Sequence, residues 1–166
     1  GALNSDQMQG LSTVQLAGLS TLQLSGMSTE DLNLLTASQF QSLSTSQIAG
    51  LTTLQFSSLE STDLAGLGTH QLRAMDTRDI AALDSADLRA LSADQLAALS
   101  TAQVRAIDSA DISAIGATAL SGLSSQQIAA LSTAQLSAMG TDQLVALNAT
   151  QLAGLTTQQL AGLGTD

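Results

Sequence analysis

Ala130-Leu-Ser-Thr-Ala-Gln-Leu-Ser137 is one unit of an eight-residue pattern that runs through the whole chain. An earlier unit, Gly10-Leu-Ser-Thr-Val-Gln-Leu-Ala17, places the same residue types at nearly all the same positions. We number these positions one to eight, starting from the small residue. A repeat this short predicts a single array over residues 1–166, in which each unit contacts its neighbours. About twenty units span 2–161, and a cut unit at 162–166 suggests an excerpt of a longer array.

Two regular structures fit the period poorly. A continuous helix turns by about 100° per residue, so an eight-residue repeat drifts by about 80° and its leucine stripe would spiral around the helix. A β-solenoid would need alternating apolar residues and β-branched side chains, whereas the units are rich in Ala, Leu and Gln. A short helix followed by a turn in every unit fits better.

Three helix-start signals coincide in nearly every unit. Position 3 holds a preferred N-cap residue such as Ser12, with Glu60 as an exception, and Gln or Asp follows three residues later. The pair Ser12/Gln15 forms the capping-box pattern, and Leu11 with Leu16 forms the hydrophobic staple around it. We therefore predict an all-α fold: an α-solenoid, or superhelical rod, in which each unit is one short capped helix plus a turn.

Such short helices need tertiary packing, because isolated helices below about 12–15 residues are marginal in water. The apolar residue at position 7 and the Leu three residues later, such as Leu16 and Leu19, share a face and are predicted to form the core. Leu96 is a representative core position. Position 1 is almost always Gly or Ala. Gly is typical of a left-handed C-cap, which Ala would strain, so the shared small size indicates close helix approach or a sharp turn.

The composition excludes several classes of protein. With 44% hydrophobic and 11% charged residues, the chain is too apolar for a disordered linker. No run of about 18 apolar residues exists, so membrane insertion is not expected. The net charge of −10 and the absence of Lys argue against nucleic acid as a partner. The absence of Cys excludes disulfides and thiolate metal sites.

Units such as Ala98-Leu-Ser-Thr-Ala-Gln-Val-Arg105 and Ala130–Ser137 resemble the ALTTAQ-type octapeptide arrays of very large bacterial secreted or cell-surface proteins, many of them adhesin-like. The resemblance covers essentially the whole chain. It implies an extended, extracellular, structural segment, and therefore a secreted or cell-surface location. No catalytic residues belong to such arrays, so none are carried over.

Charged residues concentrate between Glu60 and Asp111, where every acidic cap is followed by Asp three residues later. Three interpretations stay open: both carboxylates face water at a positive helix start, they bind structural Ca²⁺, or they form a charged contact face. Known Ca²⁺-loop motifs are absent. The candidate Ca²⁺ ligands are Asp76, Asp79, Asp84, Asp87, Asp108 and Asp111.

Other candidate sites have simpler interpretations. His70 is the only histidine, and without a partner His or Cys it predicts neither a metal site nor a catalytic triad. The serines have no base to activate them, so we predict that the chain is not an enzyme and needs no cofactor. Apolar residues at position 5 (Val14, Leu22 and Leu54) indicate a small patch for lateral self-association or scattered surface residues.

The sequence predicts a structural spacer or stalk whose partners are the neighbouring repeats of its own array. The alternative is a binding module that uses the acidic stretch 60–111, or the Ser/Thr ladder at position 4, to hold Ca²⁺, a partner, an ordered surface or a polymer. The unit Ala114–Ser121 lacks both capping-box side chains, with Gly116 at the cap and Ala119 in place of Gln. We expect this unit to be the softest joint of the rod.

Overall fold

The structure is a computed structural model that describes residues 5–163; the predicted cap Asn4 and residues 164–166 of the cut unit lie outside this range. Within it, each unit forms one short helix and no strand occurs, so the predicted all-α fold is confirmed. The α-helices are α1 Ser5–Gln9, α2 Thr13–Ala17, α3 Thr21–Ser25, α4 Thr29–Leu32, α5 Ala37–Ser42, α6 Thr45–Ala49, α7 Thr53–Ser57, α8 Ser61–Gly66, α9 Thr69–Ala74, α10 Thr77–Ala81, α11 Ser85–Ala90, α12 Ala93–Ala98, α13 Thr101–Ala106, α14 Ala117–Leu120, α15 Ser125–Ala130, α16 Thr133–Ser137, α17 Thr141–Val145, α18 Ala149–Ala153 and α19 Thr157–Leu163. One 3₁₀ helix, η1 Ile112–Ala114, lies between α13 and α14.

The predicted caps set where each helix begins. Ser100, at the start of α13, has extended backbone (φ −70°, ψ 161°), and its hydroxyl accepts a hydrogen bond from the amide of Gln103 at 3.2 Å. The Oε1 of Gln103 in turn accepts a hydrogen bond from the Ser100 amide at 2.8 Å, which completes the capping box. Glu60 makes no side-chain cap, as its exceptional residue type suggests. Asp79 and Asp87 close their boxes despite being one methylene shorter than Gln.

The turn between units contains no left-handed residue. Among the described residues no glycine or other residue has a positive φ, and Gly50 at the end of α6 stays helical at φ −89°, ψ −8°. The left-handed cap is therefore the wrong explanation for the small residue at position 1. Close packing, the other explanation, holds: a Cβ added to Gly50 would lie 2.7 Å from the Cβ of Thr21, 29 residues earlier.

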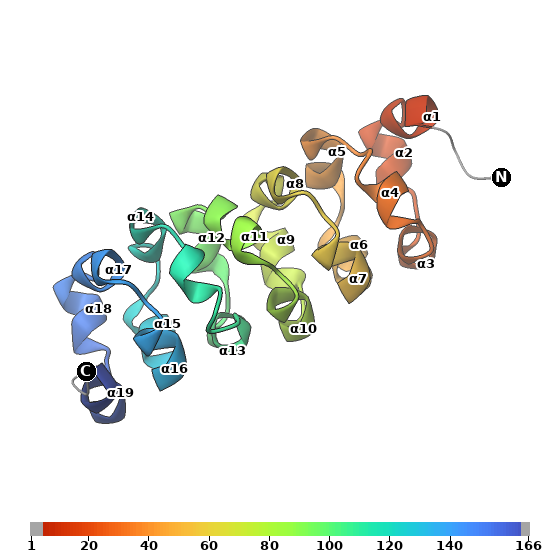
Figure 1. The fold of residues 1–166 in the computed structure, drawn as a ribbon. Helices are drawn as coiled ribbons and strands as arrows, with labels where there is room; N and C mark the ends of the chain where they lie inside the picture. Colours follow the sequence, from red (N-terminus) through yellow and green to blue (C-terminus); the bar gives the residue numbers. More distant parts are fainter. Residues whose placement is uncertain (1–4, 164–166) are drawn as a thin grey trace.

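The units wind into a superhelix with between three and four units per turn. Each helix packs against the helix three units along, as α5 does on α2 and α13 on α10. Side-chain hydrogen bonds join residues 28 to 31 positions apart, so a turn closes after about three and a half units. Figure 1 shows the result, an elongated rod of stacked turns with the two termini at opposite ends.

The core runs along the inside of the rod as one continuous apolar column. Leu96 at position 7 and Leu99 at position 2 of the next unit have exposed fractions of 0% and 4%. The same two positions are buried in nearly every described unit, and all of them belong to a single cluster. The predicted core face is therefore confirmed.

One unit departs from the helical pattern, and it is not the one with the degenerate sequence. The unit Ala114–Ser121, with Gly116 at its cap position, still forms the four-residue helix α14 and buries Leu120 completely. The preceding unit, which has Asp108 at the cap position of the sequence pattern, forms only η1 in place of an α-helix. The missing box side chains at Gly116 therefore do not abolish the helix, because burial of Leu120 still holds that unit in place.

Candidate functional site

The glutamine at position 6 makes hydrogen bonds in two directions. Gln103 accepts from the Ser100 amide through Oε1, and its Nε2 donates to the carbonyl oxygens of Leu72 and Met75, both at 2.9 Å. The side chain is only 3% exposed. One amide thus caps its own helix and ties that helix to the previous turn of the superhelix.

This pairing repeats along the rod as a ladder of glutamines, which we call the glutamine ladder. It contains Gln39, Gln47, Gln55, Gln71, Gln95, Gln103, Gln127, Gln135, Gln143, Gln151 and Gln159, each donating to carbonyl groups 28 and 31 residues earlier.

Sequence reasoning missed the donor half of the glutamine ladder. The signal was that no unit has Glu at position 6, because Glu caps a helix as well as Gln does but has no N–H to donate.

Aspartates replace glutamine in the middle of the ladder and turn inward. Asp79 is 4% exposed; its carboxylate accepts from the Asp76 amide at 3.0 Å and from the Thr53 hydroxyl at 2.9 Å. Asp63 and Asp87 are 8% and 5% exposed. The cap residues Asp76 and Asp84, which precede Asp79 and Asp87 by three positions, are exposed. The interpretation that both carboxylates of a pair face water is therefore wrong for Asp76/Asp79 and Asp84/Asp87, because position 6 faces the previous turn.

Burial shifts the pKa values of these inner carboxyls upward. The pKa of Asp63 rises from 3.8 to about 6, chiefly because burial removes water and also because Glu60 is negatively charged. Burial also raises the pKa of Asp79 and of Asp87. The exposed Asp76 shifts the other way, since the backbone amide of Asp79 donates to it and lowers its pKa.

The six candidate Ca²⁺ ligands do not converge on one place. Asp108 is exposed and Asp111 half-buried, where the Ser85 hydroxyl donates to the Asp111 carboxylate. In the part of the chain that the structure describes, no group of three or more His, Cys, Asp or Glu side chains is placed to hold a metal ion. Ca²⁺ binding by these residues stays a prediction.

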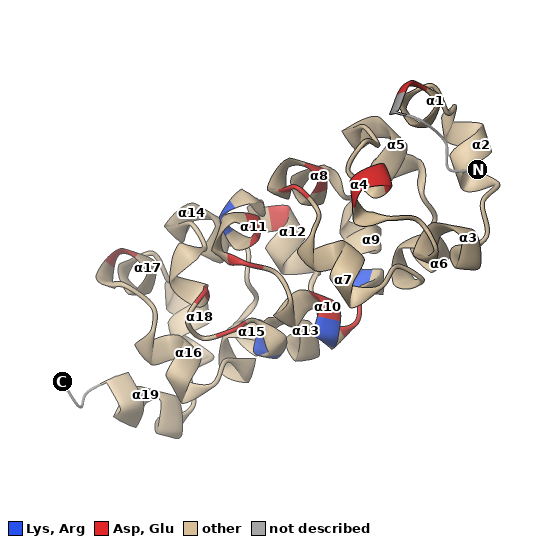
Figure 2. Ribbon diagram, turned by 45° about the vertical axis from the view of Figure 1, so that its right-hand side comes forward, with Lys and Arg blue, Asp and Glu red and all other residues tan. Residues whose placement is uncertain are grey.

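The charged residues gather around the middle of the rod, as the sequence indicates. Figure 2 shows most acidic and basic positions on the central helices, from α8 to α13. Arg73 donates a hydrogen bond from its Nε to the carbonyl oxygen of Ala98 at 3.0 Å, which links Arg73 to a helix of the next turn.

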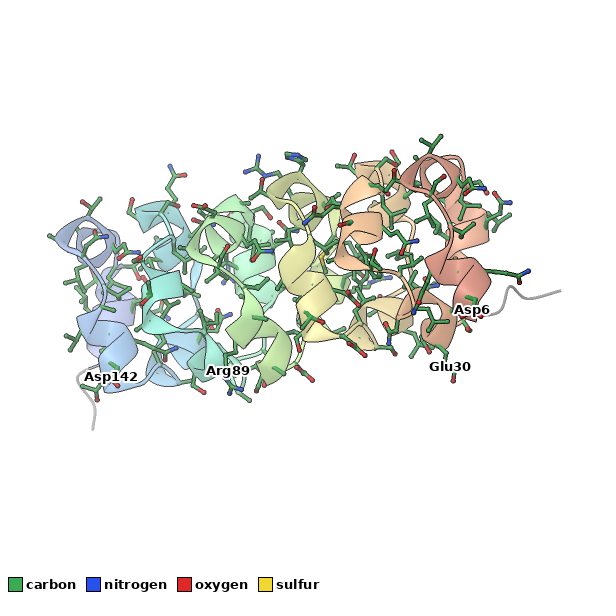
Figure 3. The ribbon with its side chains drawn as sticks, turned by 90° about the horizontal axis from the view of Figure 1, so that it is seen from above. Asp6, Glu30, Arg89 and Asp142 are labelled. Carbon is green, nitrogen blue, oxygen red and sulfur yellow. The ribbon has the colours of Figure 1, made fainter. Side chains whose placement is uncertain are left out.

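Outside the centre, Asp6, Glu30 and Asp142 are exposed at position 5 and lie along one edge of the rod with Arg89 (Figure 3).

The Ser/Thr ladder at position 4 is partly occupied by contacts inside the rod. Thr21 packs beside Gly50, and the Thr53 hydroxyl donates a hydrogen bond to the Asp79 carboxylate. At the same position, the backbone of Ala93 lies so close to Gly122 that an added Cβ would be 2.2 Å from its carbonyl oxygen. Position 4 therefore lies at the interface between successive turns as well as on the surface.

The remaining candidates are surface residues. His70 is exposed and borders a hollow with Gln41 and Gln71. Val14, Leu22 and Leu54 are 80%, 80% and 69% exposed, as predicted for position 5. None of the helices in the described range has the length and apolar character that a membrane crossing requires.

Comparison with known proteins places the architecture in a family. A family model described as ALTTAQ repeat matches residues 56–86, 80–110, 104–141 and 136–166, which together cover more than half of the chain. No curated protein and no solved structure matches the sequence significantly. The eight-residue units, their caps and the family match agree, and the chain belongs to the ALTTAQ repeat family.

Proposed function

We propose that this chain is a structural spacer, a non-catalytic rod that separates other parts of a larger assembly. The observation that carries the proposal is the glutamine ladder with its apolar column, since both join each turn to the previous one in the same way. Because every interface is between nearest neighbours, the reach of such a rod grows with the number of units. The resemblance of its units to bacterial secreted and surface arrays supports a place outside the cell.

Small-angle X-ray scattering on a lengthened rod tests the spacer. Joining Ala161 to a second copy of residues 10–161 doubles the array while keeping the eight-residue phase. We expect the radius of gyration to rise nearly twofold, because a rod extends in proportion to its units. A compact chain of doubled length would expand by only about 1.3-fold. That smaller value would contradict the proposal.

The alternative function, a binding module, rests on the aspartates that interrupt the glutamine ladder. Asp63 and Asp87 leave the carbonyl groups of the previous turn without the amide donor that Gln supplies elsewhere. Calorimetric titration with CaCl₂ tests this alternative. Heat of binding that disappears in the variant Asp84→Asn/Asp87→Asn would favour a binding module, and its absence would favour the spacer alone.

A further inference from the structure

The helices of the rod stack in three columns, and one column lacks the glutamine ladder over two successive turns. Because each helix packs on the helix three units along, α5, α8 and α11 form one column and α6, α9 and α12 form another. Figure 1 shows α5, α8 and α11 following one another along one side of the rod. We call this the aspartate column, because position 6 holds Asp63 in α8 and Asp87 in α11. The second is the glutamine column, with Gln71 in α9 and Gln95 in α12.

In the glutamine column, both interfaces carry hydrogen bonds from a side chain to the backbone of the previous turn. Gln71 donates to the carbonyl oxygens of Phe40 and Leu43, both at 2.8 Å. Gln95 donates to the carbonyl oxygen of Leu67 at 3.0 Å. Two successive turns are therefore tied together on this side of the rod.

The matching interfaces of the aspartate column have no such bonds. By the 28-residue spacing of the ladder, the buried Asp63 stands opposite the carbonyl group of Leu35, and the buried Asp87 opposite that of Leu59. No side chain in residues 5–163 donates to either carbonyl group. An ionised carboxylate has no hydrogen to donate, so two acceptors meet at each of these interfaces.

A hydroxyl group replaces the missing donor elsewhere but not in the aspartate column. In the third column, the Thr53 hydroxyl donates to Asp79, 26 residues later, and so links α7 to α10. The residue at the same distance before Asp63 is Ala37, which has no hydroxyl. Within the described range no hydroxyl donates to Asp87 either. Neither interface of the aspartate column therefore has a polar link between side chain and previous turn.

Charge weakens the aspartate column further. Glu60 and Asp63 lie at the start of α8, and Asp84 and Asp87 at the start of α11, so two pairs of carboxylates lie on helices that pack on each other. Like charges at this spacing repel. Arg89 is the one basic residue within α5, α8 and α11, and it lines a hollow of about 310 Å³ between α8 and α11.

We propose that the rod has a hinge at the aspartate column, where α8 and α11 separate from the helices before them while the glutamine column keeps the turns joined. Each turn contacts only its neighbours, so no other part of the rod replaces the missing links. Opening on one side alone bends the rod toward the glutamine column. The hinge goes beyond the spacer, because a uniformly stiff rod would still be a spacer but would have no hinge.

Double electron–electron resonance between nitroxide labels measures how far each column opens. The chain has no Cys, so labels can be placed on introduced cysteines at exposed position-5 residues. Ser38→Cys/Ala110→Cys spans the aspartate column from α5 to the unit of η1, and Ser46→Cys/Thr118→Cys spans the glutamine column from α6 to α14. Each pair crosses three interfaces, or roughly 24–30 Å. We expect a broader and longer distance distribution along the aspartate column.

Restoring the ladder should close the hinge. Asp63→Gln/Asp87→Gln supplies an amide donor at both interfaces, so the aspartate-column distribution should narrow to the width of the glutamine column. Glu30→Gln/Asp142→Gln is the matched control, because it removes two negative charges from exposed residues outside the ladder. This control should leave both distributions unchanged.

A reversed variant tests the same hinge from the other side. Gln71→Asp/Gln95→Asp removes the donors of the glutamine column and should broaden its distribution. Circular dichroism should show that each variant keeps the helical content of the unmodified chain. The proposal is overturned if the two columns of the unmodified chain have equal widths. It is also overturned if Asp63→Gln/Asp87→Gln leaves the aspartate-column distribution broad, or if Glu30→Gln/Asp142→Gln narrows it as much.

Discussion

At the residue scale, the position-6 side chain determines how one turn holds the next. Gln satisfies an orphan amide at its own helix start and two carbonyl groups of the previous turn, all away from water. The carbonyl of Leu72 also accepts from the Met75 amide, so loss of the Gln103 donor deprives chiefly the Met75 carbonyl of its partner, and a buried carbonyl without a donor costs about 1–3 kcal/mol. Asp retains the acceptor half alone, and burial of its charge raises its pKa.

Replacing Gln103 by Glu isolates the donor half. Glu can still cap Ser100, but its carboxylate would face the carbonyl oxygens of Leu72 and Met75 in a site where Gln103 is 3% exposed. We expect Gln103→Glu to lower the free energy of unfolding by about 1–3 kcal/mol in urea denaturation at neutral pH. Gln15 is exposed and has no inter-turn acceptor within residues 5–163, so Gln15→Glu should change this free energy by no more than about 0.5 kcal/mol. Equal costs at both positions would contradict a role for the inter-turn bonds.

Asp63 makes the stability of the rod depend on pH. Its pKa is raised from 3.8 to about 6, so the folded chain binds this proton more tightly than the unfolded chain does. The resulting stabilisation is fully present below about pH 3.8 and is lost as the pH rises through about 6. Burial of Asp79 and Asp87 acts in the same direction, while the lowered pKa of Asp76 opposes it.

Thermal unfolding of the unmodified chain and of Asp63→Asn, at mildly acidic and at neutral pH, measures this contribution. Because Asn has a similar shape and does not titrate, we expect the loss of stability toward neutral pH to be smaller in Asp63→Asn than in the unmodified chain. An identical pH dependence in the two proteins would show that Asp63 titrates normally.

At the element scale, each described α-helix is only four to seven residues long and depends on contacts at both its ends. The N-terminal end is capped within its own unit. The C-terminal end passes through a small residue that lies against the start of a helix in the previous turn, as Gly122 does on Ala93. A helix in this rod is therefore held by one local and one distant contact.

Substitutions at two glycines distinguish the distant contact from the local one. A Cβ at Gly122 would lie 2.2 Å from the carbonyl oxygen of Ala93, so Gly122→Ala should destabilise the rod by about 1–3 kcal/mol through forced separation of backbones. At Gly116 no atom lies within 4 Å of an added Cβ. Gly116→Ser, which supplies the missing cap hydroxyl, should be neutral or stabilise the rod by a few tenths of a kcal/mol. Chemical denaturation distinguishes the two, and a tolerated Gly122→Ala would show that the turns can move apart.

At the scale of the whole molecule, stability comes from one apolar column shared by all the turns. Leu96→Ala removes a 0% exposed side chain and should lower the free energy of unfolding by about 2–5 kcal/mol. Leu160→Ala changes the same position in α19, the last helix of the described range, where the residue is 54% exposed, and should cost much less. Urea denaturation followed by circular dichroism measures both, and similar costs would contradict the assignment of the column.

The sequence by itself determined the short helices, because caps, boxes and staples act within about four residues and recur in almost every unit. It also indicated the two core positions through their spacing, and the surface position that holds His70. Only the tertiary structure decided that a turn closes after about three and a half units and that Gln103 reaches Leu72. It likewise decided that Asp79 turns inward. These features depend on small rotations summed over several units and on contacts 28 to 31 residues apart, which no pattern within one unit encodes.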